Sequence, residues 1–272
     1  MFGFTRRRRE RLRAQPFPEE WRHILERNVP YYRCLTPEDQ SELQGHIQVF
    51  LAEKRFEGLG KPPVAITDEV RVTIAAQACI LLLHRETDYY PSLRSILVYP
   101  SRYMAPTKEQ VGVGMILEGA NVRAGESWHR GSVVLSWSDV RAGTADACDG
   151  QNVVFHEFAH QIDSESGAVE GAPALESKSM YAAWARAFER EYRSHLANLR
   201  MGRPTLLGSY AGTNPAEFFA VATEMFFERP WDLRARHPEI YERMSEFFKQ
   251  DPAERYACCG MCPAASADGA AG

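Results

Sequence analysis

The sequence lacks any apolar run long enough to cross a membrane. A spanning helix needs roughly 18 or more consecutive apolar residues, and no segment of the 272-residue chain approaches that length. The arginine-rich segment 1–13 is also not followed by the apolar stretch that a secretory signal requires. We therefore expect a soluble protein of the cytoplasm with no membrane partner.

Cysteine is scarce, and the second C-x-x-C pair that a structural zinc site would need is missing. Three cysteines are scattered through apolar or mixed segments: Cys34, Cys79 and Cys148. Such residues are typical of reduced core thiols, in agreement with a cytoplasmic location. Three more lie close together near the C-terminal end: Cys258, Cys259 and Cys262. Because a structural zinc site needs four ligands, we expect residues 258–272 to be a disordered Cys/Ala/Gly-rich tail.

Negative charge is unevenly distributed. Residues 1–13 carry six Arg against one Glu, so the rest of the chain has a net charge of −9, the overall −4 less the +5 of this segment. An acidic body argues against direct nucleic-acid binding. The run Arg6–Arg9 could contact phosphate or acidic lipid, but a solvated arm is the simpler interpretation. We expect residues 1–15 to be a basic disordered arm and residues 16–257 to be a single folded domain.

Helical patterns lie on both sides of a short region of strands. The first two span residues 18–56 and 69–84, and the later ones begin at residue 149 and continue at 175–199, 214–228 and 238–249. Strand patterns cover Ser95–Pro100 and Ser132–Trp137, with Gly- and Pro-rich loops and further short strands expected between them. N-terminal helices, a small mixed sheet and then helices predict an α+β fold.

One apolar segment, Val153–Ile162, contains two histidines four residues apart, with a glutamate after the first. Residues four apart lie on the same face of a helix, one turn from each other. His156 and His160 can therefore direct ring nitrogens at one ion about 2.0–2.1 Å away, the usual distance for zinc. Glu157 points beside the ion, where it can take a proton from a water molecule. The motif predicts a zinc site with an adjacent general base.

The residues around this motif lack positive charge. Surface helices usually interrupt their apolar face with Lys and Arg, but neither occurs between Arg141 and Lys178. Two histidines and a glutamate in so apolar a helix are costly to bury unless something satisfies them. A metal ion does so, which favours the zinc site over a chance match to a short motif.

The third zinc ligand has two candidates. A catalytic zinc takes three protein ligands and keeps its fourth position for water, and no other histidine has a spacing that recommends it. The helix predicted from Asn214 carries Glu217 and Glu224. Glu217 also fits a capping box, whereas Glu224 lies among Phe, Met and Ala without such an explanation. They are about 10.5 Å apart along the helix axis, so only one binds the ion, and the residues leave the choice open.

The strand pattern before the metal helix has a functional use. An edge strand beside a metal site can pair with an extended peptide and hold its backbone across the site. We expect this substrate-binding strand to consist of Val133, Val134, Leu135, Ser136 and Trp137.

Several motifs in the same order resemble the Mlc titration factor A family of zinc peptidases. They are HEFAHQID at 156–163, SYA at 209–211, NPAEFFA at 214–220, SWHRG at 127–131 leading into the strand at 133–137, YP at 99–100 and FKQDP at 248–252. The resemblance covers roughly residues 17–256. It implies a catalytic domain similar to that of anthrax lethal factor, with a zincin-like fold.

The resemblance also assigns the remaining site residues. The family pattern has a catalytic Tyr seven residues before a Glu ligand, and Tyr210 and Glu217 fit this spacing. Glu217 is therefore implied as the third ligand, and Tyr210 as the donor of a hydrogen bond to the oxyanion. Glu224 then orients a ligand histidine through its other ring nitrogen, a role for which Asp163 is the alternative.

The function that the resemblance implies is a cytoplasmic, aminopeptidase-like enzyme with one Zn²⁺ per chain and peptide substrates. It also implies binding to Mlc, a glucose-responsive transcriptional repressor that is thereby kept off its operators. The competing interpretation is a non-catalytic, repressor-binding regulatory protein that holds zinc for structure only. A structural zinc site usually has four protein ligands and no adjacent glutamate, so the sequence favours the peptidase.

Overall fold

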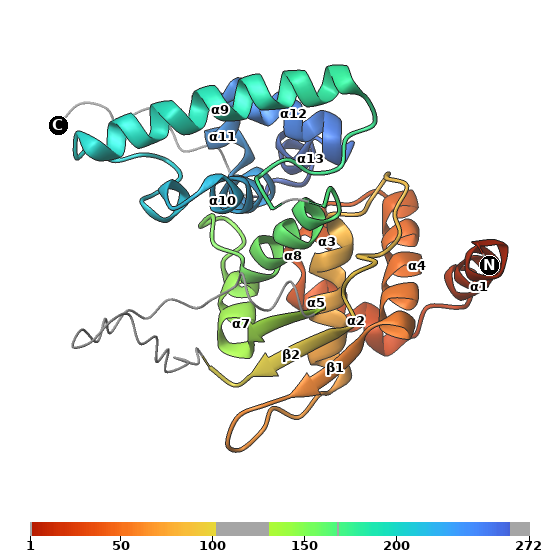
Figure 1. The fold of residues 1–272 in the computed structure, drawn as a ribbon. Coiled ribbons are helices and arrows are strands. Elements are labelled where there is room, and N and C mark those ends of the chain that lie inside the picture. Colours follow the sequence, from red (N-terminus) through yellow and green to blue (C-terminus); the bar gives the residue numbers. More distant parts are fainter. Residues whose placement is uncertain (1, 102–130, 168, 262–272) are drawn as a thin grey trace, which may run out of the picture.

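The computed structural model describes residues 2–101, 131–167 and 169–261. Its N-terminal part is helical, with α1 (Phe2–Arg13), α2 (Glu19–Asn28), α3 (Pro30–Arg33), α4 (Pro37–Glu53) and, after the first strand, α5 (Asp68–Ile80). The C-terminal part holds α7 (Trp137–Ala145), α8 (Val153–Ser164), α9 (Lys178–Arg200), the 3-10 turn η1 (Tyr210–Gly212), α10 (Pro215–Glu228), α11 (Pro230–Arg236), α12 (Pro238–Phe248) and α13 (Pro252–Cys259). In Figure 1, α9 lies along the top of the molecule, above α10 to α13. Helix α8 lies below them, and the sheet lies below α8.

The sheet is small and its described strands all run parallel. They are β1 (Arg55–Gly58), β2 (Ser95–Tyr99) and β3 (Ser132–Ser136), in the order β1-β2-β3. Alternate residues of β2 and β3 are buried, as the period of two requires. The α+β prediction is confirmed. The further short strands expected between β2 and β3 fall on residues 102–130, outside the described residues.

Strand β3 is one residue shorter than predicted. Trp137 begins helix α7 instead, because the Ser136 hydroxyl accepts a hydrogen bond from the backbone N–H of Asp139 and caps that helix. Within the described residues β3 is an edge strand, since only β2 pairs with it.

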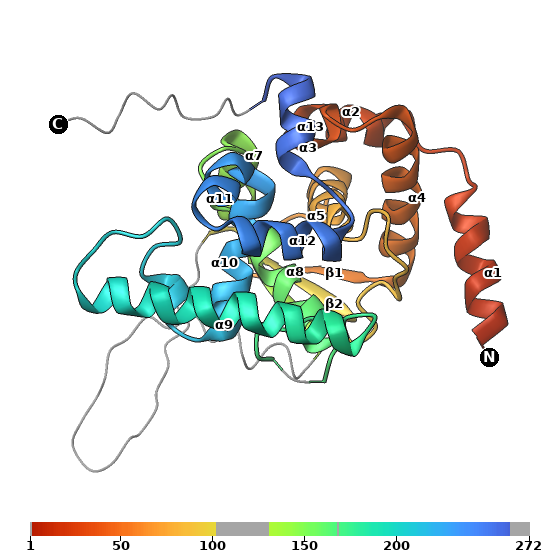
Figure 2. The same cartoon turned by 90° about the horizontal axis from the view of Figure 1, so that it is seen from above.

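The prediction of a disordered N-terminal arm is wrong, because residues 2–13 form helix α1, which packs against α4 (Figure 2). The Arg9 guanidinium bonds the Glu53 carboxylate at 2.8 and 2.9 Å and also pairs with Asp88. Leu12 packs against the core. These partners follow Arg9 by 44 and 79 residues, so the local arginine run gave no indication of them.

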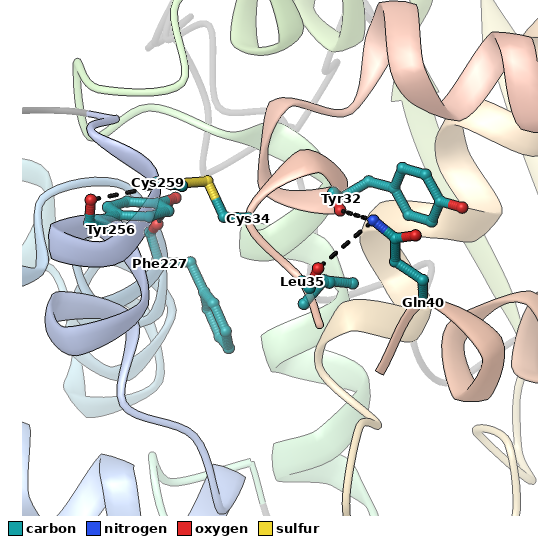
Figure 3. The surroundings of a disulfide bond; sticks show 7 residues. All are labelled: Tyr32, Cys34, Leu35, Gln40, Phe227, Tyr256 and Cys259. Carbon is teal, nitrogen blue, oxygen red and sulfur yellow. Dashed lines mark hydrogen bonds between the residues drawn. A yellow bond between two sulfur atoms is a disulfide. The ribbon is translucent and has the colours of Figure 1, made fainter. Parts of the chain in front are cut away.

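Two cysteines predicted to be reduced core thiols are oxidised. A disulfide joins Cys34, at the end of α3, to Cys259, at the end of α13 (Figure 3). Cys148 is also disulfide-bonded. Cys79 is a buried free thiol, as predicted. The sequence separation of 225 residues explains why the Cys34–Cys259 pair could not be predicted.

The disulfides change two further expectations. Residues 252–259 are helical, so the predicted tail does not begin at Cys258, and residues 262–272 lie outside the described residues. Disulfides persist mainly in oxidising compartments, so the cysteines no longer support the predicted cytoplasmic location. Among the helices of the described ranges, none has the length and apolar character that crossing a bilayer requires.

Helices α8 and α10 pack against each other in the interior and position the candidate site. Every residue of 154–163 is buried, and so is every residue of 216–228 except Val221. Helix α8 also contacts α5, and its Phe158 ring lies 4.9 Å from that of Tyr90. Polar side chains on these two helices therefore have fixed surroundings.

Candidate metal centre

The two histidines of the motif lie on the buried face of α8 that meets α10. Asn152 starts the helix, because its side-chain oxygen accepts hydrogen bonds from the backbone N–H groups of Val154 and Phe155 at 3.1 and 3.0 Å. One turn separates His156 from His160, and their ring centroids are 4.9 Å apart. The sequence spacing thus produces the predicted pair.

Helix α10 brings the third side chain. Its cap is Asn214, whose side-chain oxygen accepts a hydrogen bond from the backbone N–H of Glu217 at 2.9 Å, and Pro215 takes the first helical position. Glu217 therefore lies in the first turn, where the positive end of the helix dipole favours a carboxylate. Its side chain faces the two histidines of α8.

Three ligand atoms form a nearly regular triangle. His156 Nε2 and Glu217 Oε2 are 3.0 Å apart, and His160 Nε2 lies 3.3 Å from each of them. Tetrahedral zinc with bonds of about 2.0–2.1 Å would separate its ligand atoms by about 3.3 Å. The two nitrogens and one oxygen therefore match the donor set and the spacing of a metal ion with one open position.

Two of the three triangle residues carry the charge that suits metal binding. Burial raises the pKa of Glu217, but hydrogen bonds with His156 and His160 outweigh it and lower this pKa well below its usual range. Burial lowers the pKa of His156, yet hydrogen bonds to Glu217 and Glu224 raise it to about 10. The pKa of His160 falls to about 4, chiefly because the ring is buried. At neutral pH Glu217 is thus an anion and His160 is neutral, the forms that bind metal, whereas His156 is protonated in the metal-free site and would release this proton when a metal binds.

Glu224 lies behind His156, on the side away from the triangle. Its Oε1 is 2.8 Å from His156 Nδ1, and its Oε2 accepts a hydrogen bond of 2.6 Å from the backbone N–H of Asn152. A histidine that donates Nδ1–H to a carboxylate presents Nε2 to the metal. Glu217 thus contributes an atom to the triangle, and Glu224 contacts the ring nitrogen of His156 that faces away from it.

Asp163, the alternative for the orienting role, is directed elsewhere. Its carboxylate accepts hydrogen bonds of 2.8 Å from the backbone N–H groups of Gly171 and Ala172. Burial raises its pKa to about 6 in spite of these bonds. Asp163 holds the chain that leaves α8, whereas Glu224 contacts His156 Nδ1.

Two further predicted residues border the triangle. Glu157 follows His156 on α8 and is 9% exposed. Tyr210 lies in η1, is 52% exposed, and has its ring centroid 5.8 Å from that of His156. Burial raises the pKa of Tyr210, and the charges of Glu217 and Glu157 raise it further. Tyr210 is therefore a neutral phenol at neutral pH and can donate a hydrogen bond into the site.

The predicted substrate strand contacts the metal helix. β3 packs against α8, with Val133 and Leu135 buried and with Val134 and Ser136 partly exposed. Trp137 is the exception, because it belongs to α7.

Sequence reasoning missed two residues of this region. Asn152 both caps α8 and donates its side-chain N–H to Glu228 Oε1 at 3.0 Å. Glu228 is 1% exposed and follows Glu224 by one helical turn on α10. The position of Asn152 before an apolar run is a cap signal, whereas the pairing with Glu228 spans 76 residues and leaves no local signal.

A second group of potential ligands lies between α4 and the segment that follows α5. Atoms of Asp39, Glu42 and His84 are within 4.8 Å of one another. The group is more exposed than the first, and Arg255 Nη1 lies 2.7 Å from Asp39 Oδ2. The backbone N–H of His84 donates to Glu42 at 3.0 Å. These contacts form an ion-pair network, and we assign no metal to it.

Comparison with known proteins identifies relatives over most of the chain. A family model described as "Glucose-regulated metallo-peptidase M90" matches residues 4–249, which include all but the first two residues of α1. An uncharacterized protein of Synechocystis sp. is 39% identical over 246 residues, which is 90% of this chain and 89% of the relative. Proteins named Mlc titration factor A are 29% identical in Escherichia coli O1:K1 / APEC and 28% identical in Shigella flexneri serotype 5b, each over 242 residues, 86% of this chain and 87% of the relative.

Proposed function

The chain belongs to the glucose-regulated metallo-peptidase M90 family, and on this premise we propose that it is a zinc-dependent peptidase with aminopeptidase-like activity. The observation that carries the proposal is the triangle of His156 Nε2, His160 Nε2 and Glu217 Oε2, whose sides of 3.0–3.3 Å suit tetrahedral zinc. Glu157 and Tyr210 border the triangle as a base and a hydrogen-bond donor. A structural site would have no use for either.

The reaction divides among the residues as follows. Zinc held by the triangle would lower the pKa of water to about 7 and polarise the peptide carbonyl. Glu157 takes the proton of the attacking water and delivers it to the leaving amine. Tyr210 donates its hydroxyl proton in a hydrogen bond to the developing oxyanion. The edge of β3 that has no partner strand among the described residues holds the backbone of the peptide across the site.

Replacing Tyr210 by Phe should reduce the rate without changing the metal content. The loss of one donor to an oxyanion typically lowers kcat by about 10²–10³-fold, and Tyr210 supplies none of the triangle atoms. Steady-state kinetics and metal analysis of Tyr210→Phe test this. Tyr181→Phe is the matched control, because Tyr181 is also exposed but lies on α9. A Tyr210→Phe variant with full kcat would remove Tyr210 from the mechanism.

The aminopeptidase-like preference is tested with paired substrates. The zinc-loaded protein is assayed on amino-acid and short-peptide p-nitroanilides, each with a free and with an acetylated N-terminus. We expect hydrolysis of the free forms. Hydrolysis of the acetylated peptides at the same rate would indicate an endopeptidase, and no hydrolysis of any substrate would contradict the peptidase assignment.

We also propose a Mlc-type transcriptional repressor as a protein partner. The support is the name Mlc titration factor A of relatives that match 86% of this chain. The competing function is repressor binding without catalysis, and it predicts that the wild-type protein hydrolyses no peptide at a measurable rate. A variant that lacks Glu157 separates the two roles, because it should still bind the repressor in a pull-down assay while losing hydrolysis. A wild-type protein that binds no repressor of this class would contradict the partner.

A further inference from the structure

Helix α10 presents three buried carboxylates to α8, and the proposed mechanism uses only two of them. Glu217 belongs to the triangle and Glu224 bonds His156 Nδ1. Glu228 lies one turn beyond Glu224 and is 1% exposed. Its Oε1 accepts a hydrogen bond from Asn152 Nδ2 at 3.0 Å, and its Oε2 accepts one from the backbone N–H of Gly150 at 3.1 Å. This buried carboxyl group accepts hydrogen bonds from two groups of the chain that leads into α8, and we therefore asked what it contributes to the site.

We propose that Glu228 is a positioning residue for the metal ligand His156 and acts through Asn152. The inference rests on the zinc site of the proposed function, but it concerns metal affinity and not catalysis.

The first step of the argument is the orientation of the Asn152 amide. Its oxygen caps α8 by accepting from Val154 and Phe155, and this requires the amide nitrogen to point the other way. Glu228 is the acceptor in that direction. Without it, the buried amide N–H₂ would lose its partner, and a rotated amide would give up the cap. Glu228 therefore fixes the orientation of the Asn152 side-chain amide, with its oxygen directed at the first turn of α8.

The second step links Asn152 to His156 by two independent routes. The carbonyl oxygen of Asn152 accepts the helical hydrogen bond from the backbone N–H of His156 at 2.9 Å. The backbone N–H of Asn152 donates to Glu224 Oε2, while Glu224 Oε1 bonds His156 Nδ1. A displacement of Asn152 therefore moves both the backbone and the ring of the ligand.

The third step is the close approach of the preceding loop to α10. Gly150 has a φ of +82°, and a Cβ at this position would lie 2.4 Å from Met225 Sδ. The positive φ favours glycine at this position, and the N–H of Gly150 then reaches Glu228. The chain from Gly150 to Asn152 is thus attached to the C-terminal end of α10 at two points.

The test is the zinc dissociation constant of the full-length protein, measured by chelator competition. Loss of a group that orients a metal ligand typically weakens metal binding by about 10–100-fold, and we expect this for Glu228→Ala. Asn152→Asp is the second variant, because Asp caps helices well but places an oxygen against Glu228 in place of the donor. It should weaken zinc binding similarly while α8 keeps its cap, so it decides the matter if Glu228→Ala fails to fold.

A matched control separates positioning from general destabilisation. Thr223→Val removes a buried hydroxyl of α10 that donates to the carbonyl of Phe219 in the same helix. Urea unfolding of the metal-free proteins gives the stability of each variant. We expect Thr223→Val to lose stability yet bind zinc as the wild type does. The proposal is overturned if Glu228→Ala and Asn152→Asp also bind zinc like the wild type, or if Thr223→Val weakens zinc binding as much as they do.

The outcomes also separate this inference from the proposed function. A wild-type protein that binds zinc but hydrolyses nothing would overturn the peptidase alone. Unchanged zinc affinity in the two variants would overturn the role of Glu228 alone. A wild-type protein that binds no zinc would overturn both.

Discussion

Glu157→Gln should abolish hydrolysis while one zinc ion per chain remains bound. Glutamine has nearly the shape of glutamate but cannot take a proton from water at neutral pH, so hydrolysis should stop. Zinc should stay bound because Glu157 supplies none of the three triangle atoms. A general base typically contributes about 10²–10⁴-fold to the rate, so kcat should fall by at least that range. The measurement combines steady-state kinetics on a chromogenic peptide with metal analysis of the purified protein.

The control for this variant is Glu165→Gln. Glu165 is an exposed carboxylate at the C-terminal end of the same helix, beyond the turn that carries the histidines. The Glu165→Gln variant should keep both its hydrolytic activity and its bound zinc. Full activity in Glu157→Gln would overturn the general-base role, and loss of zinc in that variant would place Glu157 among the ligands.

Glu217→Ala should lose the metal, whereas Glu224→Ala should keep it with weaker affinity. Glu217 supplies the only oxygen of the triangle, so its removal leaves two nitrogens and no anionic ligand. Glu224 contacts His156 at the ring nitrogen that faces away from the triangle, and its loss lets the ring turn away from its position. Groups of that kind typically change metal affinity by about 10–100-fold. Zinc dissociation constants of the two variants measure the difference.

Asp163→Asn completes the comparison. It weakens the two backbone hydrogen bonds with Gly171 and Ala172, so it should lower stability and leave zinc affinity unchanged. If Glu224→Ala lost zinc completely and Glu217→Ala kept it, the two glutamates would exchange roles. If Asp163→Asn matched the zinc loss of Glu224→Ala, the orienting role would return to Asp163.

The parts of the site that depend on local spacing could be predicted from the sequence. Two histidines four apart on a buried helix, and an Asn-Pro start before Glu217, determine local geometry through the helical repeat alone. The same reasoning predicted strands β2 and β3 and the longer helices, but it did not predict α1, α7, α11 or α13, and it included the first residues of β1 in a helical pattern. The boundary at Trp137 was missed because a serine cap at Ser136 competes with the strand pattern.

The parts that depend on distant partners could not be predicted from the residues. Spacing gives the separation of Glu217 from Glu224, but it does not show which of the two faces His156 Nε2. The choice of Glu217 as the ligand therefore came from the family resemblance. Helix α1 is held by ion pairs of Arg9 with Glu53 and Asp88, and Cys34 forms its disulfide with Cys259. Glu228 depends on Asn152, 76 residues earlier. In each case the deciding contact is made by packing, and no local pattern encodes it.

Zinc titration of the metal-free wild-type protein, followed by peptide hydrolysis, tests the central claim most directly. The account predicts no activity without metal, a linear rise with added zinc, and a plateau at one equivalent per chain. It also predicts that a chelator reverses the gain. Binding of one zinc without hydrolysis of any peptide substrate would contradict the claim and favour a non-catalytic role for the metal, and full hydrolysis by the metal-free protein would contradict the metal centre itself.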